Sequence, residues 1–232
     1  MKQSRTPSGC LWGLVICMAA LLGAFFMMKL GALPWQGTAC TTPSATPAST
    51  TGEADWALLL VNHNHPLPDG YTCRTVTLTN GEQVDERIYP SLQKMFDAMR
   101  KQGLFPIVAS GYRTRAMQEQ MMQEKVDEYK SAGFSDAEAV EKAKDWVALP
   151  GTSEHESGLA VDINADGIHS TGNQIYTWLD EHAWEYGFIK RYPDNKTAIT
   201  GIRHEPWHYR YVGKAAAKEI WEQGVCLEEY LG

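Results

Sequence analysis

The sequence has 232 residues, of which 44% are hydrophobic and 21% are charged, and its formal net charge is -7. This length suits one domain of ordinary size with an appendage and is short for two full domains. No Asp or Glu precedes Glu53, so the chain after residue 52 carries 18 basic against 28 acidic residues. This acidic excess argues against a nucleic-acid partner, which would require a basic surface to displace counterions from phosphates.

The amino-terminal segment is apolar over a length that suits a membrane span. Residues 11–33 contain one charge, that of Lys29. A helix rises about 1.5 Å per residue, so this run can cross a hydrocarbon core of roughly 30 Å. Lys2 and Arg5 precede the run, and the positive-inside rule therefore predicts a cytoplasmic tail over residues 1–10 and an extracellular remainder. We expect a single-pass anchor in a bacterial cell membrane.

A cleaved signal peptide is the alternative interpretation of this terminus, with the small residues Gly37 and Ala39 at the cleavage site. The apolar run is longer than a typical signal-peptide core of about 7 to 15 residues, which favours the anchor. Residues 34–53 are rich in Thr, Ser, Ala and Pro, a composition that buries too little apolar surface to fold. We interpret them as a linker to one folded domain over residues 54–232.

The domain mixes helical and strand-like patterns without a regular alternation. Apolar spacing, capping residues and glycine stops predict five helices, at about residues 90–103, 114–132, 135–147, 175–182 and 214–223. Short strand-like runs lie between them, at residues 75–78, 105–109, 159–163 and 207–212. This order predicts an α+β fold with a largely antiparallel sheet. Outside the cytoplasm, Cys73 and Cys226 fit a disulfide and a pair of buried thiols equally well.

The first cluster of chemically useful residues is SEHESGLAVD, at residues 153–162. In an extended strand the apolar residues after Gly158 share one face, which leaves Asp162 on the open face. The turn at Gly158 brings His155 back over that face. An imidazole and a carboxylate that converge in this way are suitable ligands for zinc. The pair alone is a weak signal, because a hydrogen-bonded histidine would show the same spacing.

The second cluster is HEPWH at residues 204–208, which matches the HExxH pattern of helical zinc proteases. We interpret the match as accidental, because Pro206 inside a helix would cost on the order of 3 kcal/mol. The flanking aromatic residues favour a strand instead. On that strand His208 is the third zinc ligand, and Glu205 projects from the preceding turn toward the reacting water. His204 remains a hydrogen-bonded or exposed neighbour.

The third cluster is SGYR at residues 110–113, where a strand gives way to the second helix. An arginine at such a junction can reach into a cleft and pair with a carboxylate or a developing oxyanion. Arg113 is therefore a candidate only in combination with the first two clusters. Neither Ser110 nor Ser153 is paired in sequence with a recognisable base, and we expect no SxxK motif of the kind that serine-type peptidases carry, so the pattern does not favour a serine nucleophile.

The three clusters together resemble a known enzyme family. SEHESGLAVDI, the later segment YGFIKRYPDNKTAITGIRHEPWHYRYVG and the upstream SGYR are closely similar to the VanY-like D-alanyl-D-alanine carboxypeptidases, which are zinc peptidases of a hedgehog-like α+β fold. The resemblance spans roughly residues 59–213, and its SxHxxGxAxD and ExWH motifs are specific in combination. The segment at about residues 124–150 is longer than the motifs require.

Carried over position by position, the resemblance implies three zinc ligands, which are His155, Asp162 and His208. It also implies that Glu205 is the catalytic base and that Arg113 stabilises the scissile carbonyl. Gln118 and Ser153 would help to hold the substrate. Three protein ligands leave one position of a tetrahedral zinc site open, as in catalytic zinc sites generally.

The substrate implied is a peptidoglycan stem peptide that ends in D-Ala-D-Ala, or its lipid-linked precursor. Removal of the terminal D-Ala would also destroy the end that glycopeptide antibiotics bind, so both wall remodelling and resistance use this chemistry. Three alternatives stay open: an L,D-carboxypeptidase on tetrapeptide stems, an endopeptidase, and a non-catalytic zinc-containing module that binds peptidoglycan. Retention of Glu205 beside a three-ligand site argues against the module.

Overall fold

The computed structural model describes residues 56–232. The expected tail, anchor and linker, at residues 1–10, 11–33 and 34–53, lie outside the described residues and stay predictions. Within the described part, no helix combines the length and the hydropathy that a membrane crossing demands.

The strands form two separate antiparallel sheets. The smaller sheet pairs β1 (Thr75–Thr77) with β2 (Gln83–Asp85). The larger sheet has the order β3-β4-β6-β5 and consists of β3 (Pro106–Ser110), β4 (Ala160–Ala165), β6 (His208–Tyr211) and β5 (Phe188–Lys190). Every pairing is antiparallel, which confirms the predicted α+β class. β2 and β5, of three residues each, were not expected.

Seven α-helices and three short 3₁₀ helices connect these strands in the described part of the chain. The α-helices are α1 (Tyr89–Lys101), α2 (Arg115–Ser131), α3 (Asp136–Lys144), α4 (Gly172–His182), α5 (Thr197–Thr200), α6 (Lys214–Gln223) and α7 (Leu227–Leu231). The 3₁₀ helices are η1 (Glu154–Ser157), η2 (Ala183–Tyr186) and η3 (Asp194–Lys196). The predicted third helix ends at Lys144, earlier than expected, although its Ser135 capping box is present. The short α5 and α7 were not predicted.

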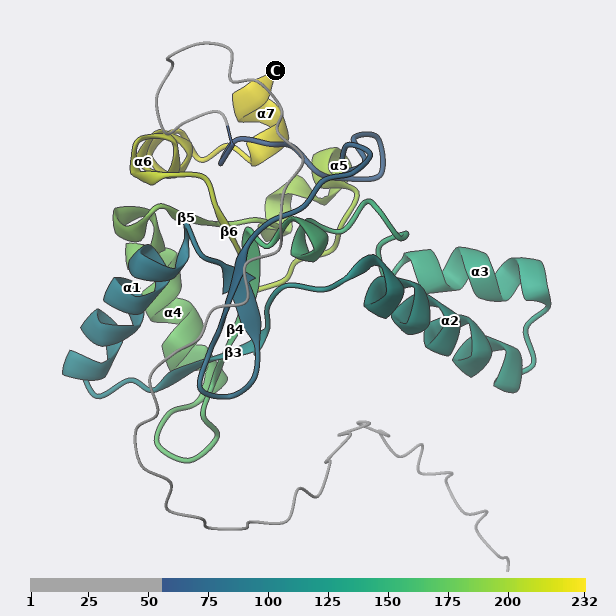
Figure 1. The fold of residues 1–232 in the computed structure, drawn as a ribbon, viewed down its shortest axis with the longest axis horizontal. Helices are drawn as coiled ribbons and strands as arrows, with labels where there is room; N and C mark the ends of the chain where they lie inside the picture. The colour runs from purple at the N-terminus through teal and green to yellow at the C-terminus, as the bar shows by residue number, and fades with distance from the viewer. Residues whose placement is uncertain (1–55) are drawn as a thin grey trace, which may run out of the picture. The chain divides into compact units, whose positions relative to one another are not determined.

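The main core lies between the larger sheet and the helices α1 and α4, which lie together on one side of it (Figure 1). Met95 and Met99 of α1, Val161 and Ile163 of β4, and Leu179 of α4 are at most 1% exposed. Burying one such side chain contributes about 1.5–3 kcal/mol. Because side chains alternate along β4, Asp162, between the core residues Val161 and Ile163, points to the other face of the sheet.

Helices α2 and α3 form a hairpin that projects away from the sheet (Figure 1). It occupies the segment that is longer than the sequence motifs require. The hairpin has its own small apolar cluster, in which Val126 of α2 packs with Ala139 and Ala143 of α3. The base of the hairpin approaches the face of the sheet that carries Asp162, as the cavity described below shows.

The two cysteines of the domain do not form a disulfide with each other. Cys73 is half-buried and Cys226 is buried, and neither is bonded within residues 56–232. Burial, reinforced by the charge of Asp85, raises the pKa of Cys73 to about 11. The alternative of a Cys73–Cys226 bridge is therefore wrong, and of the two expected buried thiols only that of Cys226 is buried.

Candidate active site

Two neighbouring strands place Asp162 and His208 side by side. In the β4–β6 pairing, Asp162 lies directly opposite His208, and side chains at directly paired positions share one face of the sheet. On the other side of β4, Asp162 is also paired with Ser110, after a shift of register in β3. The interpretation of residues 207–212 as strand, and not helix, is therefore correct in type, with β6 beginning at His208.

The short helix η1 places His155 over the same face. Gly158 ends η1 with a φ of 75°, a conformation that residues with a Cβ rarely adopt. An added Cβ would also lie 2.9 Å from Sγ of Cys73. The ring of His155 is fixed by a hydrogen bond of 2.8 Å between its Nδ1 and the carbonyl oxygen of Gly111. Because a carbonyl only accepts, Nδ1 carries the proton and Nε2 is free to bind a metal.

The three predicted ligands form one compact group. Oδ1 of Asp162 lies 3.4 Å from Nε2 of His155 and 3.1 Å from Nδ1 of His208. The ligand atoms of all three residues lie within 4.8 Å of one another. Oδ1 of Asp162 is buried and has no hydrogen-bond partner among the described residues. Two imidazole nitrogens and one carboxylate oxygen are a donor set that zinc accepts, with one position left open, so the residues present fit a catalytic zinc.

Charge coupling within the group is strong. Burial alone would raise the pKa of Asp162, but His155 and His208 hold it below its ordinary value. Burial alone would lower the pKa of His208, but the neighbouring carboxylates of Asp162 and Glu154 raise it to about 9. The metal-free site therefore keeps a proton on His208 at neutral pH.

Zinc binding to the metal-free protein near neutral pH is expected to release about one proton per zinc, because only the neutral imidazole of His208 binds a metal. Proton and zinc compete for the same nitrogen, so the apparent zinc affinity rises with pH, by up to about tenfold per pH unit, until the pH passes the pKa of about 9. Calorimetric titrations in buffers of different ionisation enthalpy measure the number of protons released. A value near zero would contradict this description of His208.

Glu205 and Arg113 face the metal group from two sides. Oε2 of Glu205 lies 3.6 Å from Nδ1 of His208, and its side chain is 27% exposed. Burial raises the pKa of Glu205 above its ordinary value, as suits a group that takes up and releases a proton. Arg113 donates from Nη2 to Oδ2 of Asp162 at 3.3 Å and from Nε to Oγ of Ser110 at 3.0 Å.

His204 lies outside the metal group. It is exposed, and its Nδ1 lies 3.2 Å from the carbonyl oxygen of Tyr192. Pro206 lies in a turn immediately before β6. The HExxH match therefore has no helix to support it, and the second histidine of the pattern is the one beside Asp162.

One cavity of about 570 Å³ connects these groups. All seven predicted site residues line it, namely Arg113, Gln118, Ser153, His155, Asp162, Glu205 and His208. Gln118 is fully buried and donates from Nε2 to the carbonyl oxygen of Ala148 at 2.8 Å. Its Oε1 has no hydrogen-bond partner within residues 56–232. The roles assigned to Gln118 and Ser153 stay predictions, although both residues are in place for them.

The cavity also has a wall that the sequence motifs did not indicate. Trp146, from the segment after α3, is 60% exposed and lines the cavity. The guanidinium of Arg203 lies over its ring, 4.6 Å from the ring centre. The only sequence signal for this wall was the extra length of the hairpin segment, which does not identify particular side chains.

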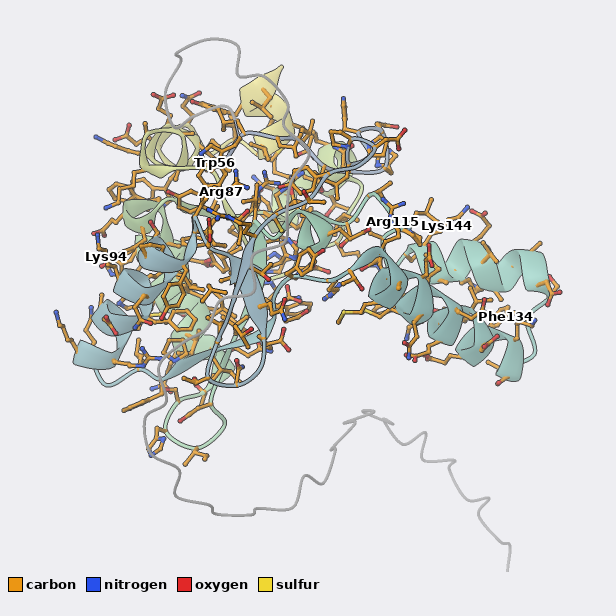
Figure 2. All side chains as sticks on the ribbon, viewed as in Figure 1. Trp56, Arg87, Lys94, Arg115, Phe134 and Lys144 are labelled. Atoms are coloured by element: carbon orange, nitrogen blue, oxygen red, sulfur yellow. The ribbon has the colours of Figure 1, made fainter. Side chains whose placement is uncertain are left out.

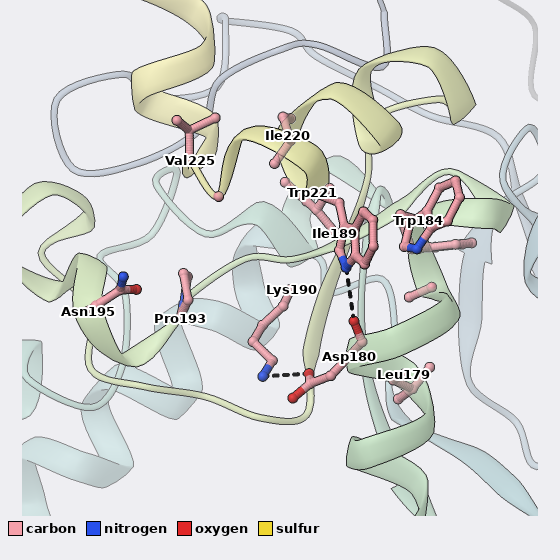
Figure 3. Close-up of a pocket in the computed structure, with 13 residues that line it drawn as sticks. Leu179, Asp180, Trp184, Ile189, Lys190, Pro193, Asn195, Ile220, Trp221 and Val225 are labelled. Carbon is pink, nitrogen blue, oxygen red and sulfur yellow. Dashed lines mark hydrogen bonds and ion pairs between the residues drawn. The ribbon is translucent and has the colours of Figure 1, made fainter.

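A second cavity, of about 340 Å³, lies between α4, β5 and α6 (Figure 3). Trp184 and Trp221 stack beside it with ring centres 5.0 Å apart. Asp180 accepts a hydrogen bond from Nε1 of Trp221 at 3.3 Å and pairs with Lys190. None of the predicted site residues lines this cavity, so the chemistry concentrates in the first one.

A serine-type mechanism has one formal candidate, because Ser91 and Lys94 match the SxxK pattern of serine peptidases. The expectation that the sequence lacks an SxxK pattern is therefore wrong. Both residues lie on α1, and neither lines the large cavity. Figure 2 shows Lys94 on the opposite side of the domain from Lys144 at the base of the hairpin. The SxxK match is therefore accidental.

All seven predicted site residues lie within the part of the chain that a known family model matches. The VanY D-alanyl-D-alanine carboxypeptidase family model matches residues 81–214. A D-alanyl-D-alanine carboxypeptidase of Enterococcus faecalis is 48% identical over 248 residues, which cover 100% of this chain and 92% of the relative.

Two solved structures are 59% identical to the chain. One, a vancomycin-resistance D,D-pentapeptidase VanY in complex with Zn(II), has a TM-score of 0.74 and covers 77% of this chain and 100% of its own. The other, VanYB in complex with D-alanine-D-alanine, has a TM-score of 0.73 and covers 76% of this chain and 98% of its own. The chain therefore belongs to the VanY family of D-alanyl-D-alanine carboxypeptidases and is a zinc metallopeptidase.

Proposed function

We propose that this protein removes the terminal D-Ala from peptidoglycan stem pentapeptides, or from their precursors, as a D,D-carboxypeptidase. The observation that carries the proposal is the convergence of three metal ligands, Glu205 and Arg113 on one cavity. A binding module would need the metal group but not a carboxylate of raised pKa beside it. A relative of known structure holds D-alanine-D-alanine, which supports this substrate class.

Different residues of the chain have different roles in the proposed hydrolysis. Zinc held by His155, Asp162 and His208 supplies a Lewis acid that polarises the scissile carbonyl and makes water more acidic. Glu205 accepts the proton of the attacking water and then donates it to the amine of the departing D-Ala. Arg113 lines the same cavity and would donate from its remaining N–H groups to the oxygen on which negative charge develops.

Two further residues of the cavity, Gln118 and Ser153, support the proposal with groups that could hold a substrate before reaction. Gln118 has a buried acceptor, Oε1, that is unsatisfied in the described part of the chain. A buried unpaired acceptor is costly, and a peptide N–H of the substrate would satisfy it. Ser153 lies at the start of η1 and offers a hydroxyl at the wall of the cavity. Together they add binding groups next to the reacting bond.

To test the proposal, zinc-loaded protein is incubated with stem pentapeptides and with stem tetrapeptides, and the masses of the products are measured by mass spectrometry. Loss of one D-Ala from the pentapeptide, with the tetrapeptide left intact, is the expected result. Cleavage of the tetrapeptide alone would identify an L,D-carboxypeptidase, and an internal cut would identify an endopeptidase. Binding of both peptides without cleavage would identify the non-catalytic module.

We also propose that the domain is anchored on the outer side of a bacterial cytoplasmic membrane. The apolar run at residues 11–33, with Lys2 and Arg5 before it, supports the anchor and its orientation. Protease added to intact protoplasts should then digest the domain. Protection of the domain in sealed protoplasts would overturn the orientation.

A role in glycopeptide resistance follows from the same reaction, because a stem peptide without its last D-Ala lacks the end that these antibiotics bind. The name of the zinc-bound relative, a vancomycin-resistance enzyme, supports this role. Cells that express the protein should tolerate more vancomycin than cells that express an inactive Glu205→Ala variant. Equal tolerance would restrict the protein to ordinary wall remodelling.

A further inference from the structure

We propose that Glu154 is a positioning residue of the zinc site, and that two buried arginines connect it to both ends of the domain. Glu154 lies in η1, immediately before His155, and its side chain is 0% exposed. Its Oε2 lies 3.3 Å from Nε2 of His208. Nδ1 of the same ring faces Asp162, so a proton held on Nε2 by Glu154 leaves Nδ1 free for the metal.

The carboxylate of Glu154 is itself held by two arginines. Oε1 accepts hydrogen bonds from Nε of Arg191 at 2.7 Å and from Nη1 of Arg210 at 3.0 Å. Both arginine side chains are 0% exposed. With His208, three donors thus converge on one carboxylate. Such a set of contacts fixes the side chain in a single orientation, and through it the plane of the His208 ring.

The guanidinium groups of Arg191 and Arg210 carry two positive charges, and the carboxylate of Glu154 neutralises only one of them. The carboxy-terminal helix α7 supplies a second carboxylate. Glu228 of α7 accepts two parallel hydrogen bonds from Arg191, with Oε2 to Nη1 at 2.7 Å and Oε1 to Nη2 at 2.6 Å. Paired hydrogen bonds of this kind fix the guanidinium plane. The orientation of Arg191 toward Glu154 therefore depends on α7.

The amino-terminal end of the domain is connected to Glu154 through the second arginine, Arg210. Nη2 of Arg210 donates to the carbonyl oxygens of Ala57 and Leu59, at 3.0 Å and 2.7 Å. Ala57, Leu59 and Glu228 all lie outside residues 81–214, the part that matches the family model. The affinity for zinc thus depends on segments beyond the catalytic motifs.

The first test replaces Glu154 with glutamine, which has a similar shape but offers one acceptor oxygen to three donors. We expect zinc affinity, measured by competition with a chromophoric chelator, to fall about 10- to 100-fold, as is typical when an outer partner of a metal ligand is lost. The absorption spectrum of the cobalt-substituted protein should also change, because His208 is no longer fixed. Circular dichroism of the metal-free variant reports whether the fold is retained.

A folded Glu154→Gln variant with wild-type zinc affinity and an unchanged cobalt spectrum would overturn the proposal. This outcome differs from failure of the zinc site itself, in which the wild-type protein would not bind zinc either. A purely structural role would lower the stability of the metal-free protein without changing the cobalt spectrum.

If Glu154→Gln does not fold, Glu228→Gln tests the same connection from α7, with Glu229→Gln as the matched control. Glu229 is the next residue of the same helix, pairs with Lys196 and accepts a hydrogen bond from the backbone N–H of Cys226, which the side-chain oxygen of a glutamine can also accept. We expect Glu228→Gln to weaken zinc binding about threefold or more, and Glu229→Gln to leave it unchanged. Equal zinc affinity in the two variants would overturn the proposal.

Discussion

Glu205→Ala is expected to lower kcat on a D-Ala-D-Ala-terminated peptide by about 10²- to 10⁴-fold, the usual contribution of a general acid-base group. Glu205 is not among the three metal ligands, so zinc content and folding should stay close to wild type. KM should change much less, because Arg113 and Ser153 remain in the cavity. Steady-state kinetics together with metal analysis by atomic emission measure all three quantities.

Glu222→Ala is a suitable control for this variant. Glu222 lies on α6, outside the large cavity, and its side chain is 53% exposed. It should retain wild-type kcat and KM. A Glu205→Ala protein that keeps most of its activity would assign proton transfer to another residue and leave the enzyme class unchanged.

His208→Ala is expected to lose stoichiometric zinc, whereas His204→Ala should keep about one zinc per chain. The reason is geometric, because Nδ1 of His208 lies 3.1 Å from Oδ1 of Asp162, while the exposed ring of His204 contacts the Tyr192 carbonyl. Loss of one of three protein ligands also removes activity, since a zinc site needs its donors in place. Metal content after dialysis gives the answer for both variants.

The opposite result, with zinc lost from His204→Ala and kept by His208→Ala, would restore the helical HExxH interpretation. It would also contradict the pairing of β6 with β4. The two histidines thus test the strand assignment and the ligand set in one experiment.

The main elements of the fold could be predicted from local sequence, because their signals are local. The capping box of Ser135 and the apolar spacing in α1 each act within a few residues. Pro206 excluded a helix for the same reason. The direct pairing of Asp162 with His208 could not be predicted, because the register of strands that are far apart in sequence depends on tertiary packing.

The metal ligands were accessible to sequence reasoning, while the residues that support them were not. His155 and Asp162 stand in one short motif, and the interpretation of residues 207–212 as a strand identified their partner His208, which the resemblance also implies. Glu154, Arg191 and Glu228 are charged residues, which are expected at the surface unless paired. Their pairing joins positions 37 residues apart in each case, and no local pattern indicates such a contact.

We propose that this cavity hydrolyses D-Ala-D-Ala peptides with one zinc held by His155, Asp162 and His208. The most direct test measures the D-Ala that the protein releases from a stem pentapeptide before metal removal, after metal removal with a chelator, and after zinc is returned. We predict that release stops in the metal-free protein and recovers with about one equivalent of zinc. Release that persists in fully metal-free protein, or that stays absent when the zinc site is full, would contradict the account.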